Sequence, residues 1–315
     1  MRRWQWLIPA GVLAGLATVA AAQAQKAPVP LGSSVLAAQA QAQPAPGQLR
    51  SPDQDNDSAF VRFFRNAEWY ASLGRSKQYW APSDIHVSQP SLGNDFTIHD
   101  VHGTDEFSPS DIYNPDLFGP QYNIRIGRFI NDARTIAIEF SLDHSKYQTT
   151  IGQTAQVTGL VNNVPINSSQ QLTNAYFSEV LHNGANHVMI NAVYRYPLIG
   201  QINETLSLAG IAKAGIGLMV PHTSDTVLGN ANYVGDKTLG NAIGFTNGWW
   251  QINGWTAGVE LGVRAVLYKP VYLELTDKLA YSRLVDLPAY AGTLQQSLWM
   301  NEIVVSLGVT YDGPR

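Results

Sequence analysis

The chain contains 315 residues, of which 45% are apolar, only 14% are Asp, Glu, Lys or Arg, and none is cysteine. Soluble domains carry about 25% charged residues, so this chain has too few charges for an ordinary soluble surface. Its mean hydropathy of −0.11 excludes a membrane protein built from several long apolar helices. The lack of cysteine excludes thiol catalysis, disulfides and cysteine-bound zinc.

The charge balance argues against nucleic-acid binding. The 24 acidic and 20 basic residues give a net charge of −4, and no basic excess marks a surface for phosphates. No motif for a cofactor is present, so we expect neither a cofactor nor a nucleic-acid partner.

The N-terminus has the pattern of an export signal. Arg2 and Arg3 precede an apolar run, 7–22, which ends in small residues with two A-x-A patterns. This predicts a secretory signal peptide over 1–24. The next segment, 25–58, is rich in Ala, Gln, Pro and Ser, which predicts a flexible periplasmic linker. The remaining domain, 59–315, should form the folded part.

Within this domain the apolar residues recur with a period of two. In Arg134–Tyr147, for example, Ile136 and Ile138 lie on one face while Glu139 and Ser141 lie on the other. The same alternation predicts ten strands: Tyr70–Ser76, Ile85–Gln89, Phe96–Val101, Tyr122–Phe129, Arg134–Tyr147, His187–Tyr196, Leu206–Leu218, Trp255–Leu267, Val271–Ser282 and Leu298–Tyr311.

We expect ten strands, and the pattern is compatible with any number from eight to twelve. The segment 85–89 is the weakest of the ten, whereas 156–160 and 164–167 could add two more. Asp277 interrupts the apolar face of its strand, which predicts a bulge or a local change of register there.

Short and long connections alternate along the domain. The connections at 131–133, 196–203 and 269–270 are short, whereas 148–186, 221–250 and 286–296 are long and polar. Outer-membrane barrels have short periplasmic turns and long extracellular loops. Aromatic residues near the predicted strand ends fit the girdles that such barrels place at the lipid interfaces: Tyr194, Tyr196, Trp255, Tyr268, Tyr272, Tyr281, Trp299 and Tyr311.

The last predicted strand, Val304–Tyr311, is similar to the C-terminal strand that outer-membrane barrels present to their assembly machinery, although Asp312–Arg315 follow where the family pattern ends on an aromatic residue. With these features, 60–315 resembles a Gram-negative outer-membrane β-barrel protein, with no narrower family assigned. The resemblance implies an all-β transmembrane antiparallel barrel in the cell outer membrane. It also implies contact with outer-membrane lipid and lipopolysaccharide, and insertion by the barrel-assembly machinery; no oligomeric state is indicated.

Ten charged residues fall on the predicted lumen face. Buried charges are tolerated when they are paired, so we expect a network of ion pairs that closes the narrow interior; the alternative is a narrow channel whose charges select ions. The positive residues are Arg125, Arg195, Lys213, Arg264 and Lys278, and the negative residues are Glu139, Asp143, Glu260, Glu274 and Glu302.

Histidines and aspartates gather at the predicted extracellular rim. The candidate catalytic residues are Asp84, His86, Asp143 and His144, because a carboxylate that orients a histidine can activate water or a serine. Asp84-Ile-His86 is similar to half of the site of omptin proteases, but the D-x-D half is missing, and the His-x-Ser-Asn of lipid A deacylases is not matched. A hydrolase acting on lipid A or peptides is therefore an alternative.

Other rim features predict less specific roles. Metal binding by His182, His187 and His222 would require three loops to converge, and we predict no metal site. The loops 162–173 and 230–250 are polar, with aromatic residues in the second, and could bind sugars or a protein. The sequence thus predicts a non-enzymatic surface barrel with a role in the envelope or in binding through its loops.

Overall fold

The computed structural model describes residues 67–312 except 182, 203, 233, 235–242 and 245–248. The predicted signal peptide and linker, His182 and much of the 230–250 loop lie outside the described residues. None of the helices in the described part of the chain has the length and apolar character needed to cross a membrane.

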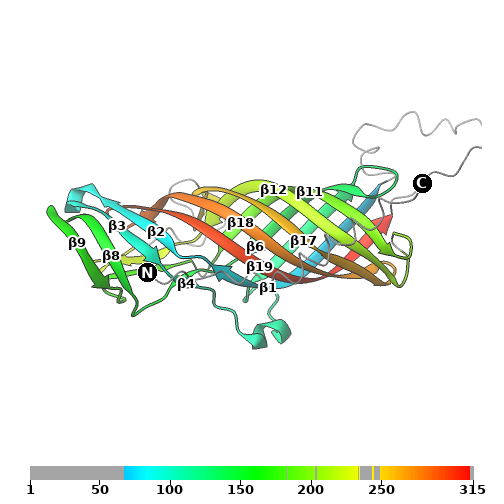
Figure 1. The fold of residues 1–315 in the computed structure, drawn as a ribbon, viewed down its shortest axis with the longest axis horizontal. Helices are drawn as coiled ribbons and strands as arrows, with labels where there is room; N and C mark the ends of the chain where they lie inside the picture. The colour runs from blue at the N-terminus through cyan, green and yellow to red at the C-terminus, as the bar shows by residue number, and fades with distance from the viewer. Residues whose placement is uncertain are drawn as a thin grey trace, which may run out of the picture. The chain divides into compact units, whose positions relative to one another are not determined.

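Eight antiparallel strands close into a barrel, because the last strand pairs with the first (Figure 1). Around the ring these strands are β1 (Glu68–Trp80), β5 (Tyr122–Phe129), β6 (Ile136–His144), β11 (Ala185–Ile199), β12 (Ser207–Pro221), β17 (Gly254–Tyr268), β18 (Val271–Ala289) and β19 (Gly292–Asp312). The structure confirms the all-β antiparallel barrel, with a ring at the lower end of the expected range.

The alternation of side chains explains why these segments form a closed wall. In β6, Ala137, Glu139 and Ser141 are buried while Ile138 and Phe140 are exposed. A strand whose two faces meet different surroundings must keep a period of two, and closure leaves no unpaired edge in the ring.

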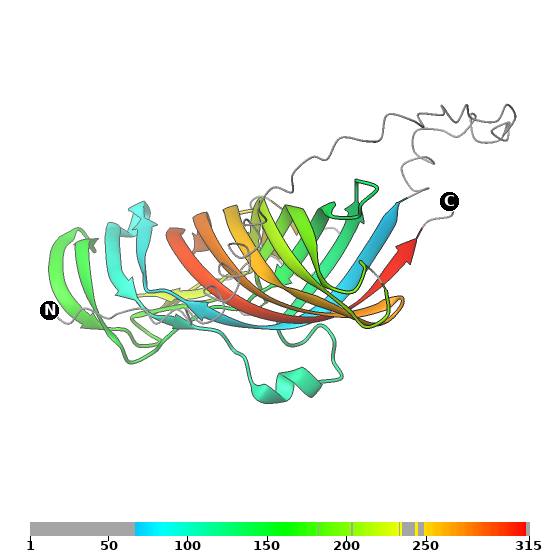
Figure 2. The same ribbon diagram turned by 45° about the vertical axis from the view of Figure 1, so that its right-hand side comes forward.

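The two remaining expected strands lie outside the ring. β2 (Ser83–Gln89) pairs with the part of β19 beyond the barrel, and the same sheet continues through β3 (Asn94–Val101), β8 (Thr154–Val161) and β9 (Val164–Gln171). We call these four strands the extension. In Figure 2 the extension fans away from one end of the barrel, as cyan and green strands.

The β18–β19 hairpin differs from the expectation of a long loop over 286–296. Both strands continue almost to the turn at Tyr290 and Ala291. The register shifts between Leu284 and Leu287, where Asp286 has a positive φ of 51°. This bulge keeps both leucines buried. The hairpin therefore continues beyond the end of the barrel.

A second, small sheet covers the inner side of the extension. This cover sheet has the order β14 (Asn230–Ala231), β13 (Ser224–Val227), β10 (Phe177–Val180), β7 (Gln148–Thr149) and β4 (Gly103–Thr104). The other short elements are the parallel pair β15 (Ile243–Gly244) and β16 (Trp250–Gln251), with the 3-10 helices η2 (Pro90–Leu92) and η3 (Pro109–Tyr113).

A large apolar core joins the extension, the cover sheet and the end of the barrel nearest the extension. Phe96 and Val157 come from the extension, Phe177 and Val227 from the cover sheet, and Leu294 from the long hairpin. All five are at most 1% exposed. The two layers therefore bury apolar surface between them as a domain core does, and the extension is a built module rather than a set of loops.

The expected irregularity at Asp277 is absent, because the pairing on both sides of this residue is regular. Its side chain points outward and accepts a hydrogen bond of 2.5 Å from Asn301 Nδ2 on β19. The carboxylate is thus tolerated on the apolar face because a neighbouring strand supplies a donor.

Candidate functional site: the barrel interior and its rim

At the end of the barrel where the connecting turns are short (the short-turn end), an ion pair in the interior links β1 and β11. Arg195 Nη1 lies 3.1 Å from Glu68 Oε1, and the Arg195 guanidinium lies 3.8 Å from the centre of the Phe129 ring. Arg134 reaches the same carboxylate at 3.6 Å. Both Arg195 and Glu68 are at most 2% exposed, so this end of the lumen is occupied by paired side chains.

One layer further in, an arginine is held between two tyrosine rings. The Arg264 guanidinium lies 4.4 Å from the ring centre of Tyr70 and 4.1 Å from that of Tyr272, distances at which cation–π attraction acts. Gly127 and Gly308 stand opposite the two tyrosines, and a Cβ at either glycine would meet the ring. The absent side chains therefore leave the space that the rings fill.

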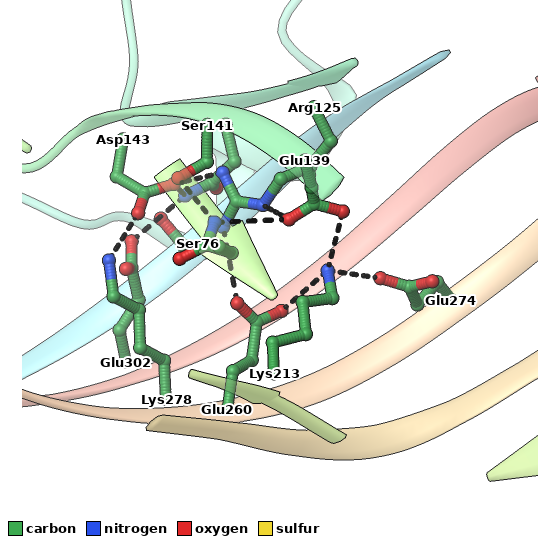
Figure 3. A network of polar contacts seen from close by, with 12 residues as sticks. Ser76, Arg125, Glu139, Ser141, Asp143, Lys213, Glu260, Glu274, Lys278 and Glu302 are labelled. Carbon is green, nitrogen blue, oxygen red and sulfur yellow. Dashed lines mark hydrogen bonds and ion pairs between the residues drawn. The ribbon is translucent and has the colours of Figure 1, made fainter. Parts of the chain in front are cut away.

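Lys213 is the centre of the network (Figure 3). Its Nζ lies 2.9 Å from Glu274, 3.2 Å from Glu260 and 3.3 Å from Glu139. These three carboxylates come from β18, β17 and β6. A buried ammonium has three donors, and here each faces a carboxylate, so one side chain ties three strands together across the lumen.

Asp143 anchors the layer nearest the extension. Its carboxylate pairs with Arg125 and with Lys278 and accepts a hydrogen bond of 2.7 Å from Asn123 Nδ2. Asn123 also donates to Glu302 at 3.0 Å. All five side chains are buried, and Figure 3 shows Arg125, Asp143, Lys278 and Glu302 converging within the barrel.

All ten predicted lumen residues are buried on the inward face of their strands. They are Arg125, Glu139, Asp143, Arg195, Lys213, Glu260, Arg264, Glu274, Lys278 and Glu302. The sequence did not identify Glu68, Tyr70 or Tyr272 as members. Glu68 lies before the expected start of its strand. Tyrosine is also common at lipid interfaces, so the sequence does not show that these two tyrosines point into the lumen.

Apolar side chains fill the barrel mouth beyond the charged layers. Trp80, Ala280 and Met300 line the inner wall there, and Tyr147 packs edge-to-face on Trp80 with ring centres 5.5 Å apart. These residues belong to the apolar core that joins the extension and the cover sheet. The ion-pair network thus lies beneath a layer of mainly apolar side chains.

The four candidate catalytic residues do not form one site. Asp84 contacts His99 at 3.1 Å, whereas His86 contacts Asp95 at 2.8 Å, both on the exposed side of the extension. Asp143 lies in the lumen network, and His144 is buried against Asn186 with an Nδ1–Oδ1 distance of 2.7 Å. These two are consecutive on β6 and point to opposite faces, so they do not face one common pocket.

The other rim histidines are also separated. His187 is fully buried in the barrel, and its Nδ1 lies 3.0 Å from Thr256 Oγ1. His222 stacks on Trp249 with ring centres 3.9 Å apart. Among the residues that the structure describes, no three His, Asp or Glu side chains converge in a way that could hold a metal ion.

Two buried carboxylates in the cover sheet were not identified by the sequence. Glu179 on β10 and Asp225 on β13 face each other across the strand pair and are 0% and 2% exposed. Burial raises the pKa of Glu179 to about 8. Burial, together with the negative charge of Glu179, raises the pKa of Asp225 well above its usual range. Short strands with one inward acid each give no periodic signal that would reveal the pair.

The outer wall of the ring has the opposite character to the interior. Exposed aliphatic residues cover its middle, including Ile138, Ile216 and Leu307. At the end of the barrel nearest the extension, the Tyr281 ring lies between those of Trp255 and Trp299 in two tilted pairs, with ring centres 5.5 and 5.1 Å apart. At the short-turn end the exposed aromatic residues are Tyr194, Tyr196, Tyr268 and Tyr311. An apolar band between two aromatic girdles is the surface that a bilayer requires of a closed barrel.

The chain is a transmembrane β-barrel of the outer-membrane type. Such barrels place their short turns in the periplasm, which predicts an extracellular position for the extension and the cover sheet. The interior is polar and the exterior apolar, which is the reverse of a soluble barrel.

No protein-family profile matches the sequence, and no curated protein matches it. The solved structures that it resembles are outer-membrane β-barrel proteins. Neisserial surface protein A is 11% identical over 78% of this chain and 96% of that one, with a TM-score of 0.34. OprG from Pseudomonas aeruginosa is 9% identical over 79% and 98%, with a TM-score of 0.34. AlkL, solved in lipid bilayers, is 10% identical over 80% and 93%, with a TM-score of 0.33.

Proposed function

We propose that this protein is a non-enzymatic outer-membrane barrel, closed to solutes, that presents the extension at the cell surface to recognise a partner. In this proposal the signal peptide, 1–24, directs export and the segment 25–58 is a periplasmic linker. The barrel-assembly machinery inserts the domain, and outer-membrane lipid and lipopolysaccharide surround its apolar band.

The observation that carries the proposal is the continuation of the β18–β19 hairpin beyond the extracellular girdle into a layered structure with its own apolar core. A channel needs a continuous water path, whereas charged pairs and an apolar layer occupy this interior. Interiors of barrels with about eight strands are commonly filled by side chains. The proposal therefore assigns the lumen to stability and the extension to function.

The exposed face of the extension supports a role in binding. Many of its side chains are polar and are held by contacts between strands: His99 Nε2 lies 2.8 Å from Thr158 Oγ1, and Gln156 donates to Asn167 at 2.7 Å. Side chains that are already ordered lose little conformational freedom when a partner binds. A face of hydroxyl, amide, imidazole and carboxylate groups suits a hydrogen-bonding partner such as a glycan or the polar surface of a protein.

Cell-binding assays with surface variants test this role. Lysines at Thr97, Gln156 and Ser169 would change the exposed face of the extension, and lysines at Gln201 and Glu204 would serve as a matched control at the periplasmic turns. Cells would be tested on arrays of glycans and extracellular-matrix proteins. We expect binding that the first variant loses and the second retains. Binding that does not exceed that of cells lacking the protein, or that is equal in both variants, would overturn the proposal.

A further inference from the structure

The apolar outer wall is interrupted at β1 by two cations. Alternate residues of β1 are buried in the lumen, so Arg75 and Lys77 lie on the outer face. They pair in register with Val305 and Ile303 of β19, which face the lipid. Tyr79, the outward residue next to Lys77, is 54% exposed and lies towards the extracellular girdle. Both cations therefore lie within the band that the membrane covers.

The segment formed by residues 105–118, between β4 and β5, lies over these two cations on the outer face of the wall. The Arg75 guanidinium donates hydrogen bonds to the carbonyl oxygens of Asp116 at 2.8 Å, Leu117 at 2.9 Å and Asn114 at 3.3 Å. Lys77 pairs with Asp105. An arginine on the lipid-facing side of a barrel is strongly unfavourable, and here backbone oxygens replace the water that it would otherwise need.

Several polar groups of the segment are hydrogen-bonded within the segment itself. Asp111 accepts a hydrogen bond of 2.8 Å from the Ser108 N–H at the start of η3. Asp116 Oδ1 accepts one of 3.0 Å from the Phe118 N–H, and its own N–H donates to Asn114 Oδ1 at 2.9 Å. Irregular backbone is tolerated near hydrocarbon only where its polar groups have protein partners, and this segment largely meets that condition.

The exposed side chains of the segment include four large apolar ones. Ile112 is 55% exposed, Tyr113 85%, Leu117 50% and Phe118 60%. Figures 1 and 2 both show this segment, with its short helical turn, standing off the outer side of the barrel beside β1. Phe118 also packs edge-to-face on Tyr122 at the start of β5, with ring centres 5.2 Å apart, so the segment contacts the wall while much of its apolar surface stays exposed.

We propose that residues 105–118 form an interfacial loop that inserts Ile112, Tyr113, Leu117 and Phe118 between the lipids of the outer leaflet, with Arg75 and Lys77 holding the loop against the wall. Aromatic and aliphatic side chains together favour the boundary between headgroups and acyl chains. The occupant is lipid, because the wall beneath the loop belongs to the apolar band of the barrel. The inference depends on the membrane orientation and is independent of any partner at the extension.

Depth-dependent fluorescence quenching tests the insertion. Because the chain has no cysteine, Tyr113→Cys provides a single labelling site, and Ser168→Cys on the exposed strand β9 provides the aqueous control. Both would carry the environment-sensitive dye NBD in phosphatidylcholine vesicles with nitroxides at the headgroup or at acyl carbon 5. We expect a blue-shifted emission at 113, quenched by the nitroxides and protected from iodide, with the reverse at 168.

Two results would overturn the proposal. The first is a label at 113 that iodide quenches as strongly as the label at 168 and that the nitroxides do not quench. The second is rapid disulfide formation between Tyr113→Cys copies in the same vesicles, which would show that a second copy covers the loop.

The role of Arg75 has its own test. In the labelled protein, Arg75→Gln should reduce nitroxide quenching at 113 at least twofold, because the loop loses its hydrogen bonds to the wall. Arg283→Gln is the matched control, since Arg283 is also an outward arginine and bonds Ser297 and Gln295 on the extracellular side. Equal quenching in the two variants would contradict the assignment of Arg75 as the residue that holds the loop.

Discussion

Replacing Lys213 with methionine tests the lumen network at its centre. The ammonium lies within 3.3 Å of three carboxylates, those of Glu139, Glu260 and Glu274. At an effective dielectric constant near 20, each contact is worth about 5 kcal/mol in gross Coulomb energy, and desolvation offsets most of that. Removing one partner from a buried ion pair costs about 3–5 kcal/mol net, so we expect Lys213→Met to lower the free energy of unfolding by that amount.

The assay is urea unfolding of the barrel in phosphatidylcholine vesicles, followed by tryptophan fluorescence and by the gel shift between folded and heated protein. Lys269→Met is the control, because Lys269 is 48% exposed where it pairs with Asp312, and exposed pairs contribute about 0–1 kcal/mol. Adding Glu260→Gln to Lys213→Met should restore part of the loss. A Lys213→Met cost no larger than that of the control, or additive effects in the double variant, would refute the reasoning.

Three further predictions concern the cover sheet, the tyrosine packing and the rim. Burial raises the pKa of Glu179 from 4.5 to about 8, so the folded state holds a proton that the unfolded state has lost between these pH values. The contribution of Glu179 to the free energy of unfolding should therefore fall by about 5 kcal/mol as pH rises from 4.5 to 8, and Asp225, whose pKa is also raised, acts in the same direction. Glu179→Gln should make this dependence less steep in hydrogen exchange of β10, and an unchanged slope would contradict it. Gly308→Ala should cost about 1–3 kcal/mol by overpacking against the Tyr272 ring, and a double variant with Tyr272→Ala should cost less than the sum of the single changes in urea unfolding. Joint replacement of His86 and His144 by alanine should leave the lipid A mass spectrum of expressing cells identical to that of wild type, whereas a difference would support hydrolysis.

The strands of the ring could be predicted because one face meets lipid and the other a polar interior, which imposes a period of two over long segments. The extension could not be predicted as a separate module. Its strands are short, and both of their faces lie outside the membrane, so the alternation in β2 is no different from that of a wall strand. Asp286 and Gly292 are typical of a loop, yet the first supports a bulge and the second begins β19.

For the candidate site, inward charges could be predicted as a set but not as pairs. Lys213 contacts acids from three strands whose sequence positions differ by up to 135 residues between Glu139 and Glu274, and only closure of the ring brings them together. Short sequence motifs did not predict which side chains contact each other at the rim. Asp143 and His144 are neighbours in sequence, but adjacent residues of a strand point to opposite faces.

Single-channel recording in planar lipid bilayers tests the central claim most directly. The wild-type barrel, folded in detergent and shown to be inserted by its heat-dependent gel shift, should produce no discrete conductance steps in concentrated potassium chloride, because paired charges fill the lumen and an apolar layer closes its mouth. Reproducible steps of uniform size from the wild-type protein would contradict the account and identify the barrel as a channel.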